Sequence, residues 1–392
     1  MRKVYLDANA TTPVHPEVTE AMIPFCRGIF GNASSVHSFG REARKNLEAA
    51  RKKVAALINA ASPDEIVFTS GGTESDNFAI KGVASALKEK GSHIITSSVE
   101  HLAVLNTCKY LEKMGCKVTY LGVDKYGVID LEELKKSVTD KTILITIMAA
   151  NNETGTIMPV EKIAQIAKDK GVTFHTDAVQ MIGKMPFDVK KMGADLVSMS
   201  AHKINGPKGT GALYIKKGTR IDKFIHGGHH EKNRRAGTEN VSGIVGFGKA
   251  CEIMQKEGAE KYDKVKELRD ELHRRIEKNI KQVMLNGHPE NRLPNTLNIS
   301  FKYLEGESIL LSLDLEGIAA STGSACTSGS LEPSHVLKAM GVEPMFAQGS
   351  VRFSLGVFNT KEDIAYVAEK LPPIIERLRK MSPVYKPEEN DR

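Results

Sequence analysis

Short apolar runs alternate with helix-like segments through the first two-thirds of the chain. The segments 77–87 and 102–114, for example, repeat apolar residues at close to the period of a helix. This alternation predicts an α/β fold, in which helices cover a large, mostly parallel sheet and ligands bind beyond the carboxyl ends of the strands. Seven runs are expected to form the sheet: Glu65–Thr69, His93–Thr96, Lys117–Leu121, Thr142–Ile147, Val172–Thr176, Asp195–Met199 and Gly211–Ile215.

A different pattern follows a long helical stretch at 242–280. Strands at 295–301 and 350–355 alternate with helices at 307–315 and 361–380, which predicts a smaller α+β domain. We therefore expect three parts: a large domain at 13–256, a small domain formed by 1–12 and 257–382, and a loose tail at 383–392.

The composition fits a folded protein with no specialised surface. Of the 392 residues, 41% are hydrophobic and 26% are charged, and the net charge of +7 is spread without long blocks of one sign. This distribution argues against a dedicated nucleic-acid surface. Because no apolar run is long enough to span a bilayer and the amino terminus lacks a signal-like stretch, we expect a cytoplasmic protein without membrane contact.

The five cysteines differ in their surroundings. Their number is odd and they form no CxxC pair, which argues against both a disulfide framework and a zinc cage. Cys108, Cys116 and Cys251 lie in regular elements and are expected to be small buried hydrophobes, whereas Cys26 fits no clear pattern. Cys326 lies in a polar, glycine-containing loop at 321–330, so we interpret it as a reachable nucleophile.

Lys203 follows the apolar run 194–200 and precedes a glycine-rich stretch at 205–211. A lysine at the end of a buried strand is costly unless it is neutral, paired or covalently engaged, which favours a Schiff base with a carbonyl cofactor. The alternative is a surface lysine in a loop, and this segment alone leaves the two open.

Polar groups follow several other predicted strands. The turn at 71–76 opens a helix and is suited to bind phosphate, unless Thr73 merely caps that helix. Asp177 is suited to keep a pyridine nitrogen protonated, His101 to stack on a ring, and the segment 151–155 to supply amides; simple capping or turn roles are the alternatives. With Gln180 and Lys203, this ordered set predicts pyridoxal 5′-phosphate.

Nine motifs spread over nearly the whole chain resemble the cysteine desulfurases of the NifS/IscS type, within the class V aminotransferases. That family has the aspartate-aminotransferase-like fold, known as fold type I among pyridoxal-phosphate enzymes, and works as homodimers. The motifs are Tyr5–Pro13, Gly31–Ser35, Ser70–Asn77, Glu100–His101, Asn151–Gly155, His175–Gln180, Ser200–Lys203, Arg235–Asn240 and Gly323–Cys326.

The resemblance assigns the cofactor's partners residue by residue. Lys203 forms the internal aldimine and His101 stacks on the ring. Asp177 binds the ring nitrogen and Gln180 the phenolic oxygen, with Asn152 on the same ring face. The phosphate is bound by Gly72, Thr73, Ser200 and His202 of the same subunit.

The resemblance also assigns the substrate site, the reaction and the partners. Thr238 reaches the phosphate of the other subunit, and Arg352, helped by Asn152, binds the carboxylate of L-cysteine; residue alternation alone would make Arg352 a surface arginine. Cys326 takes the substrate sulfur as a persulfide and leaves alanine. The sulfur then passes to iron–sulfur cluster assembly, with a scaffold protein of the IscU/NifU type as acceptor, or to other sulfur acceptors. Cys326 is a possible ligand of a transferred cluster, and any role of the enzyme in tRNA thiolation is expected to be indirect.

Three histidines at 226, 229 and 230 occupy a segment in which the family usually has Gln-Glu at 230–231, so a metal site is an alternative for them. The motif at 7–10 also departs mildly from the family's pattern. A selenocysteine lyase, another class V enzyme or a non-catalytic docking protein that binds pyridoxal phosphate remain competing interpretations. The sequence does not separate a nitrogenase-dedicated enzyme from general iron–sulfur assembly.

Overall fold

A seven-stranded sheet forms the core of the computed structural model, which describes residues 2–322 and 333–386. Its strand order is β2-β8-β7-β6-β5-β3-β4. The strands are β2 Ile66–Thr69, β3 His93–Ser97, β4 Lys117–Leu121, β5 Thr142–Thr146, β6 Thr173–Asp177, β7 Leu196–Ser200 and β8 Gly211–Ile215. Each lies within one residue of its predicted range.

All strands of this sheet except β8 run in the same direction. β8 is antiparallel to both β2 and β7, whereas the other neighbouring pairs are parallel. The prediction of a mostly parallel sheet is therefore confirmed. β2, β3, β5, β6 and β7 end at one common edge, and the segments that follow them carry most of the predicted site residues.

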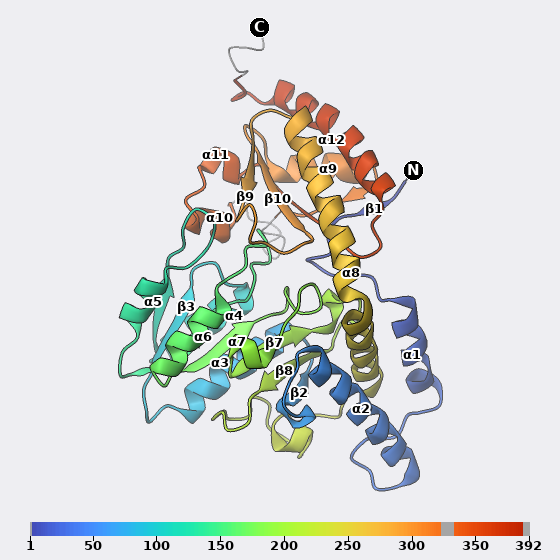
Figure 1. Ribbon diagram of the computed structural model, residues 1–392, viewed down its shortest axis with the longest axis vertical. Coiled ribbons are helices and arrows are strands. Elements are labelled where there is room, and N and C mark those ends of the chain that lie inside the picture. Colours follow the sequence, from blue (N-terminus) through green and yellow to red (C-terminus); the bar gives the residue numbers. More distant parts are fainter. Residues whose placement is uncertain (1, 323–332, 387–392) are drawn as a thin grey trace.

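Helices surround this sheet (Figure 1). α3 begins at Gly72, earlier than the predicted 77, because the small polar residues at its start are tolerated at a helix amino terminus even though they disfavour a helix interior. The α-helices are α1 Pro16–Arg27, α2 Ser38–Leu57, α3 Gly72–Ala86, α4 Leu102–Lys113, α5 Leu131–Ser137, α6 Val160–Asp169, α7 Val189–Met192, α8 Val241–Asn279, α9 Gly306–Leu315, α10 His335–Ala339, α11 Pro344–Ala347 and α12 Lys361–Met381. The 3-10 turns in the described ranges are η1 Pro63–Glu65, η2 Ala201–Lys203 and η3 Glu231–Asn233.

The carboxyl-terminal part forms a second layer, in the upper half of Figure 1. Its antiparallel sheet has the order β12-β10-β9, with β9 Val283–Asn286, β10 Thr296–Phe301 and β12 Ser350–Ser354. The amino-terminal β1 Val4–Tyr5 pairs in parallel with β11 Ile318–Ala319. The first residues of the chain therefore lie against its carboxyl-terminal third.

The 39-residue helix α8 connects the two layers, packing on α1 and α2 below and on α12 above (Figure 1). The domain boundary expected at residue 256 falls inside this continuous helix, so the division at 13–256 and 257–382 stays a prediction, as does the loose tail at 383–392. No helix in the described ranges is both long and apolar enough to cross a membrane.

Candidate active site

Lys203 lies in η2, directly after β7, and its amine is held by backbone carbonyls. Nζ donates hydrogen bonds to the carbonyl oxygens of Asn9, at 2.5 Å, and Ala10, at 2.8 Å. The side chain is half-buried. Two oxygen acceptors stabilise an ammonium or orient a neutral amine. Lys203 is therefore held in place, and the alternative of a surface lysine in a loop is wrong.

His101 and Asp177 lie near Lys203, close enough for its charge to affect the pKa of both. His101 is the N-cap of α4, where its Nδ1 accepts a hydrogen bond from the backbone nitrogen of Ala103 over 3.1 Å, so the capping role is real. Burial lowers the pKa of His101, and the neighbouring Asp177 carboxylate opposes this effect while Lys203 adds to it. Burial raises the pKa of Asp177, while His101 and Lys203 act to lower it. The structure thus brings these three predicted residues together.

Two further acids lie buried beside Asp177. Asp76, on α3, is 1% exposed, and its Oδ1 has no hydrogen-bond partner in the described chain. Burial and the nearby Asp177 raise its pKa. Burial also raises the pKa of Glu100 to about 8, against hydrogen bonds from Ser97 and Met148 that act to lower it. Asp76 and Glu100 therefore stay protonated to a higher pH than exposed carboxyls, unless a positive charge is bound beside them.

His175, on β6, bridges Thr146 of β5 and Ser198 of β7 and remains neutral. Its Nδ1 lies 2.8 Å from Thr146 Oγ1 and its Nε2 lies 3.0 Å from Ser198 Oγ. Burial lowers its pKa to about 3. Because the ring carries no charge near neutral pH, it offers Asp76 a dipole 3.7 Å away but no counter-ion.

The amino terminus of α3 is suited to bind an anion. Gly71 is its N-cap and supplies no side-chain hydrogen bond, so the alternative that Thr73 caps this helix is wrong. The first N–H groups of a helix have no intrahelical partner. Ser200 Oγ is buried without a partner in the described chain and faces this turn: a Cβ built on Gly71 would lie 3.9 Å from it. Thr73 is exposed.

These observations fit a phosphorylated pyridine cofactor. The uncapped turn and the partnerless Ser200 hydroxyl suit a phosphate, while Asp177 suits a protonated ring nitrogen. Gly72 lets the start of α3 approach the segment after β6 closely, since a Cβ there would lie only 2.8 Å from Val179 Cγ2. His202 lies next to Lys203, its Nδ1 3.1 Å from Thr11 Oγ1, and burial lowers its pKa to about 4.

Arg352 is buried, so the surface position expected from residue alternation is wrong. On β12, it is 4% exposed, and its Nη2 donates to Asp7 Oδ1 over 2.9 Å. Its Nη1 donates to the backbone oxygen of Asn152 over 3.0 Å, whereas Nε has no partner in the described chain. Burial is possible because Asp7, far away in sequence, supplies the opposite charge.

Thr238 lies exposed in the loop between η3 and α8, and the structure does not join it to the Lys203 cluster. The loop is anchored at two points. Arg235 Nε donates to Glu74 Oε1 over 2.8 Å, next to the start of α3. Glu231 is buried and accepts two hydrogen bonds of 2.7 Å from Arg51.

Two of the three histidines of this loop are placed by the turn η3. His229 Nδ1 lies 2.9 Å from Asn233 Oδ1, and His230 precedes η3 as its N-cap. In the described ranges, no group of three or more His, Cys, Asp or Glu side chains is placed to hold a metal ion.

The candidate nucleophile Cys326 lies outside the described residues. Of the other cysteines, Cys108 and Cys251 are buried as expected, and burial raises the pKa of both, to about 12 for Cys108. Cys116 is only partly buried, contrary to the expectation, because it precedes the edge strand β4, and Cys26 is exposed. All four are free thiols.

Asn9 and Lys184 were missed by the sequence reasoning, yet they contact the predicted residues directly. The Asn9 carbonyl accepts hydrogen bonds from both Lys203 and Gln180, and Lys184 donates to Gln180. Asn9 lies in the motif Tyr5–Pro13, within the segment 7–10 that departs mildly from the family's pattern. No local pattern marks Lys184, whose position depends on contacts across the fold.

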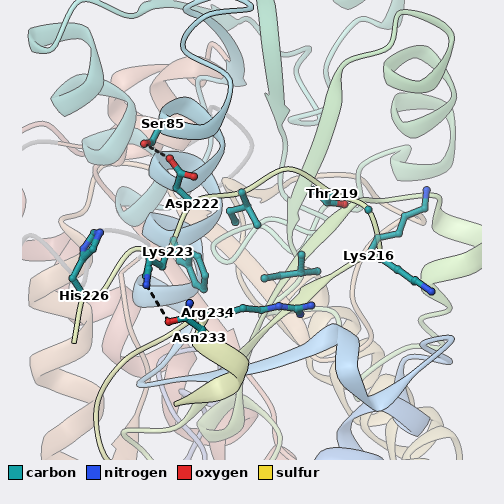
Figure 2. Close-up of a pocket in the computed structure, with 13 residues that line it drawn as sticks. Ser85, Lys216, Thr219, Asp222, Lys223, His226, Asn233 and Arg234 are labelled. Atoms are coloured by element: carbon teal, nitrogen blue, oxygen red, sulfur yellow. Dashed lines mark hydrogen bonds between the residues drawn. The ribbon is translucent and has the colours of Figure 1, made fainter. Parts of the chain in front are cut away.

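A separate pocket of about 540 Å³ lies beside the carboxyl end of β8, lined by basic and apolar side chains (Figure 2). Four of its labelled polar groups form two pairs: Ser85 donates to Asp222 over 2.6 Å and Lys223 to Asn233 over 3.0 Å. Its lining in the described chain includes none of the predicted site residues. The pocket is therefore distinct from the strand-end site.

Comparison with known proteins identifies close relatives. The family model described as Aminotransferase class-V matches residues 4–367. The chain is 58% identical to a cysteine desulfurase IscS of Dictyoglomus turgidum, over 99% of this chain and 98% of that protein. It is 55% identical to a cysteine desulfurase IscS of Methanosarcina thermophila, over 98% of this chain and 94% of that protein. A solved NifS-like protein matches 96% of this chain and 100% of its own, with a TM-score of 0.91 and 44% identity.

Proposed function

Because the chain belongs to the class V aminotransferase family and is a cysteine desulfurase, we propose that it removes sulfur from L-cysteine with pyridoxal phosphate bound at the strand-end site. The observation that carries this proposal is that His101 and Asp177 lie close enough to Lys203 for its charge to act on the pKa of both.

The resemblance to the family supplies the contacts proposed for the cofactor. Lys203 would hold it covalently through Nζ, His101 would cover the ring, and Asp177 would bind the ring nitrogen. Gln180 would donate to the phenolic oxygen, and Asn152 would add a contact to the ring. Gly72, Thr73, Ser200 and His202 would hold the phosphate. When bound, pyridoxal phosphate supplies an electron sink for the carbanion formed at the substrate's α-carbon.

Arg352 is proposed to bind the substrate carboxylate. A guanidinium pairs well with a carboxylate, and the partnerless Nε supports a further hydrogen bond from this side chain. The displaced Lys203 amine then takes the α-proton at Nζ, and the carbonyls of Asn9 and Ala10 stabilise the ammonium that results.

Cys326 is proposed to take the sulfur. Its thiolate attacks the sulfur of L-cysteine, an S–S bond forms, and the C–S electron pair passes to the carbon skeleton. Protonation of the β-carbon that has lost the sulfur, and return of a proton to the α-carbon, give L-alanine. One cysteine and one enzyme thiol thus yield one alanine and one persulfide. The persulfide then passes its outer sulfur to an acceptor thiol, for which an iron–sulfur scaffold protein of the IscU/NifU type is proposed.

We further propose a homodimer in which Thr238 of each subunit reaches the phosphate bound by the other. The exposure of Thr238 and the anchoring of its loop through Arg235 to Glu74 support this role.

The proposal is tested by the products formed from L-cysteine. Purified protein with pyridoxal phosphate and a thiol reductant is expected to release alanine and sulfide in equal amounts. Cys326→Ser should bind the cofactor normally but lose both products, with Cys26→Ser as a matched control that keeps them. Full product formation by Cys326→Ser would contradict the proposed route.

A further inference from the structure

Lys184 carries a buried amine to which the proposed reaction steps assign no role. It lies in the turn that follows β6 and is 3% exposed. Within the described residues its amine pairs with no carboxylate. It donates instead to two side-chain amide oxygens, Gln180 Oε1 at 2.7 Å and Asn9 Oδ1 at 3.1 Å. Both amides belong to the strand-end site.

The contact with Gln180 decides which way this amide faces. Because Lys184 donates an N–H to Oε1, the opposite end of the amide is directed away from it. Gln180 Nε2 donates to the Asn9 carbonyl oxygen over 2.9 Å, and the same oxygen accepts from Lys203 Nζ. The amide N–H of Gln180 is thereby presented beside the cofactor-binding lysine.

The contact with Asn9 likewise decides which way the Asn9 amide faces, here toward the segment proposed to bind the substrate. Asn9 Oδ1 accepts from Lys184 and, over 2.9 Å, from Asn295 Nδ2. Its Nδ2 therefore donates to the Asn152 carbonyl over 3.1 Å, and this carbonyl also accepts from Arg352 Nη1 over 3.0 Å. One amine thus orients two amides, one linked to Lys203 and the other to Arg352.

We propose that Lys184 is a positioning residue for the desulfuration, which holds the Gln180 amide toward the cofactor and the Asn9 amide toward the substrate-binding segment. This inference rests on the proposed function. The two donated hydrogen bonds require only two N–H groups, so the neutral amine performs the role as well as the ammonium.

Burial makes Lys184 a poor choice for stability alone. Its pKa is lowered well below the usual value, first by burial and then by the positive charges of Lys203 and Arg352. An apolar side chain of similar length avoids this desolvation cost. The presence of an amine here is better explained by its orienting contacts.

The test compares cofactor affinity in Lys184→Met with that in Lys191→Met, which removes an exposed lysine nearby. Titration of the apoproteins with pyridoxal phosphate, followed by the visible absorption band, is expected to show about 3- to 10-fold weaker binding for Lys184→Met, as expected for one misplaced hydrogen bond. Lys191→Met should bind like the wild type. The unfolding midpoint of each apoprotein is measured in parallel.

A double-mutant cycle distinguishes positioning from general damage. If Lys184 acts through Gln180, Lys184→Met should weaken cofactor binding little further in a Gln180→Ala background. Equal affinity of Lys184→Met and wild type, or fully additive losses in the double variant, would overturn the inference. If Lys184→Met does not fold, Lys184→Leu, which also removes the N–H donors, replaces it in the same cycle. Absence of the band in wild-type protein would instead refute the proposed function.

Discussion

The Arg352 guanidinium donates a hydrogen bond to the Asp7 carboxylate over 2.9 Å, at a position where both side chains are largely shielded from water. The pair joins β12 to the segment after β1, which are 345 residues apart in the chain. The proposed substrate arginine is therefore already partly neutralised before a substrate carboxylate arrives.

Arg352→Lys is expected to raise KM for L-cysteine about 10- to 100-fold, because a charged hydrogen bond in a fixed fork contributes roughly 1.5–3 kcal/mol. The effect on kcat should be smaller, since the lost interaction binds the substrate in its ground state as well. Steady-state alanine formation measures both constants. Arg274→Lys, at an exposed site on α8, is the control, and an unchanged KM in Arg352→Lys would refute the carboxylate role.

Lys203→Ala is expected to abolish the visible absorption band that a Schiff base with pyridoxal phosphate produces. The reason is that Lys184, the other buried amine beside Gln180, is engaged with the side-chain oxygens of Gln180 and Asn9. Lys208→Ala, in the exposed part of the following glycine-rich loop, should keep the band. A band of normal intensity in Lys203→Ala would show that the cofactor is attached covalently to another amine.

Glu231→Gln is expected to lower the free energy of unfolding by about 3–5 kcal/mol, because it leaves the buried Arg51 charge without its partner. Glu48→Gln removes a more exposed partner of the same arginine, so its cost should be only about 0–1 kcal/mol. Denaturant unfolding of both variants measures the difference. Equal costs would show that the Arg51–Glu231 contact does not anchor the loop.

Glu100 is expected to make the protein less stable as the pH rises. Burial raises its pKa from 4.5 to about 8, so between these values the folded state keeps a proton that the unfolded state releases. Its contribution to stability is complete below pH 4.5 and is lost as the pH rises through about 8. Glu100→Gln should flatten this decline in urea unfolding between these limits. A slope identical to the wild type would show that Glu100 ionises normally.

The sheet could be predicted from sequence because its strands, apart from the partly exposed edge strand β4, are buried and therefore read as continuous apolar runs. The order in which Asp177 and Lys203 follow their strands was equally visible, since both lie within a few residues of a strand end. Arg352 could not be placed this way. Its burial depends on Asp7, a partner brought close only by the three-dimensional fold.

Asn9 and Lys184 show the same limit inside the site. Asn9 contacts Gln180, 171 positions away, and Lys184, 175 positions away, so no local pattern reveals the network. The roles assigned to Thr73 and Thr238 came from resemblance alone and stay predictions. Cys326 was recognised from its polar surroundings in sequence, and its geometry lies outside the described residues.

The most direct test of the central claim is the mass of the peptide that contains Cys326 after the loaded enzyme has reacted with L-cysteine without a reductant. The account predicts that this peptide gains the mass of one sulfur atom, that the gain is removed by a reductant, and that it does not occur in Lys203→Ala. Alanine formation with no added sulfur on Cys326 would contradict it.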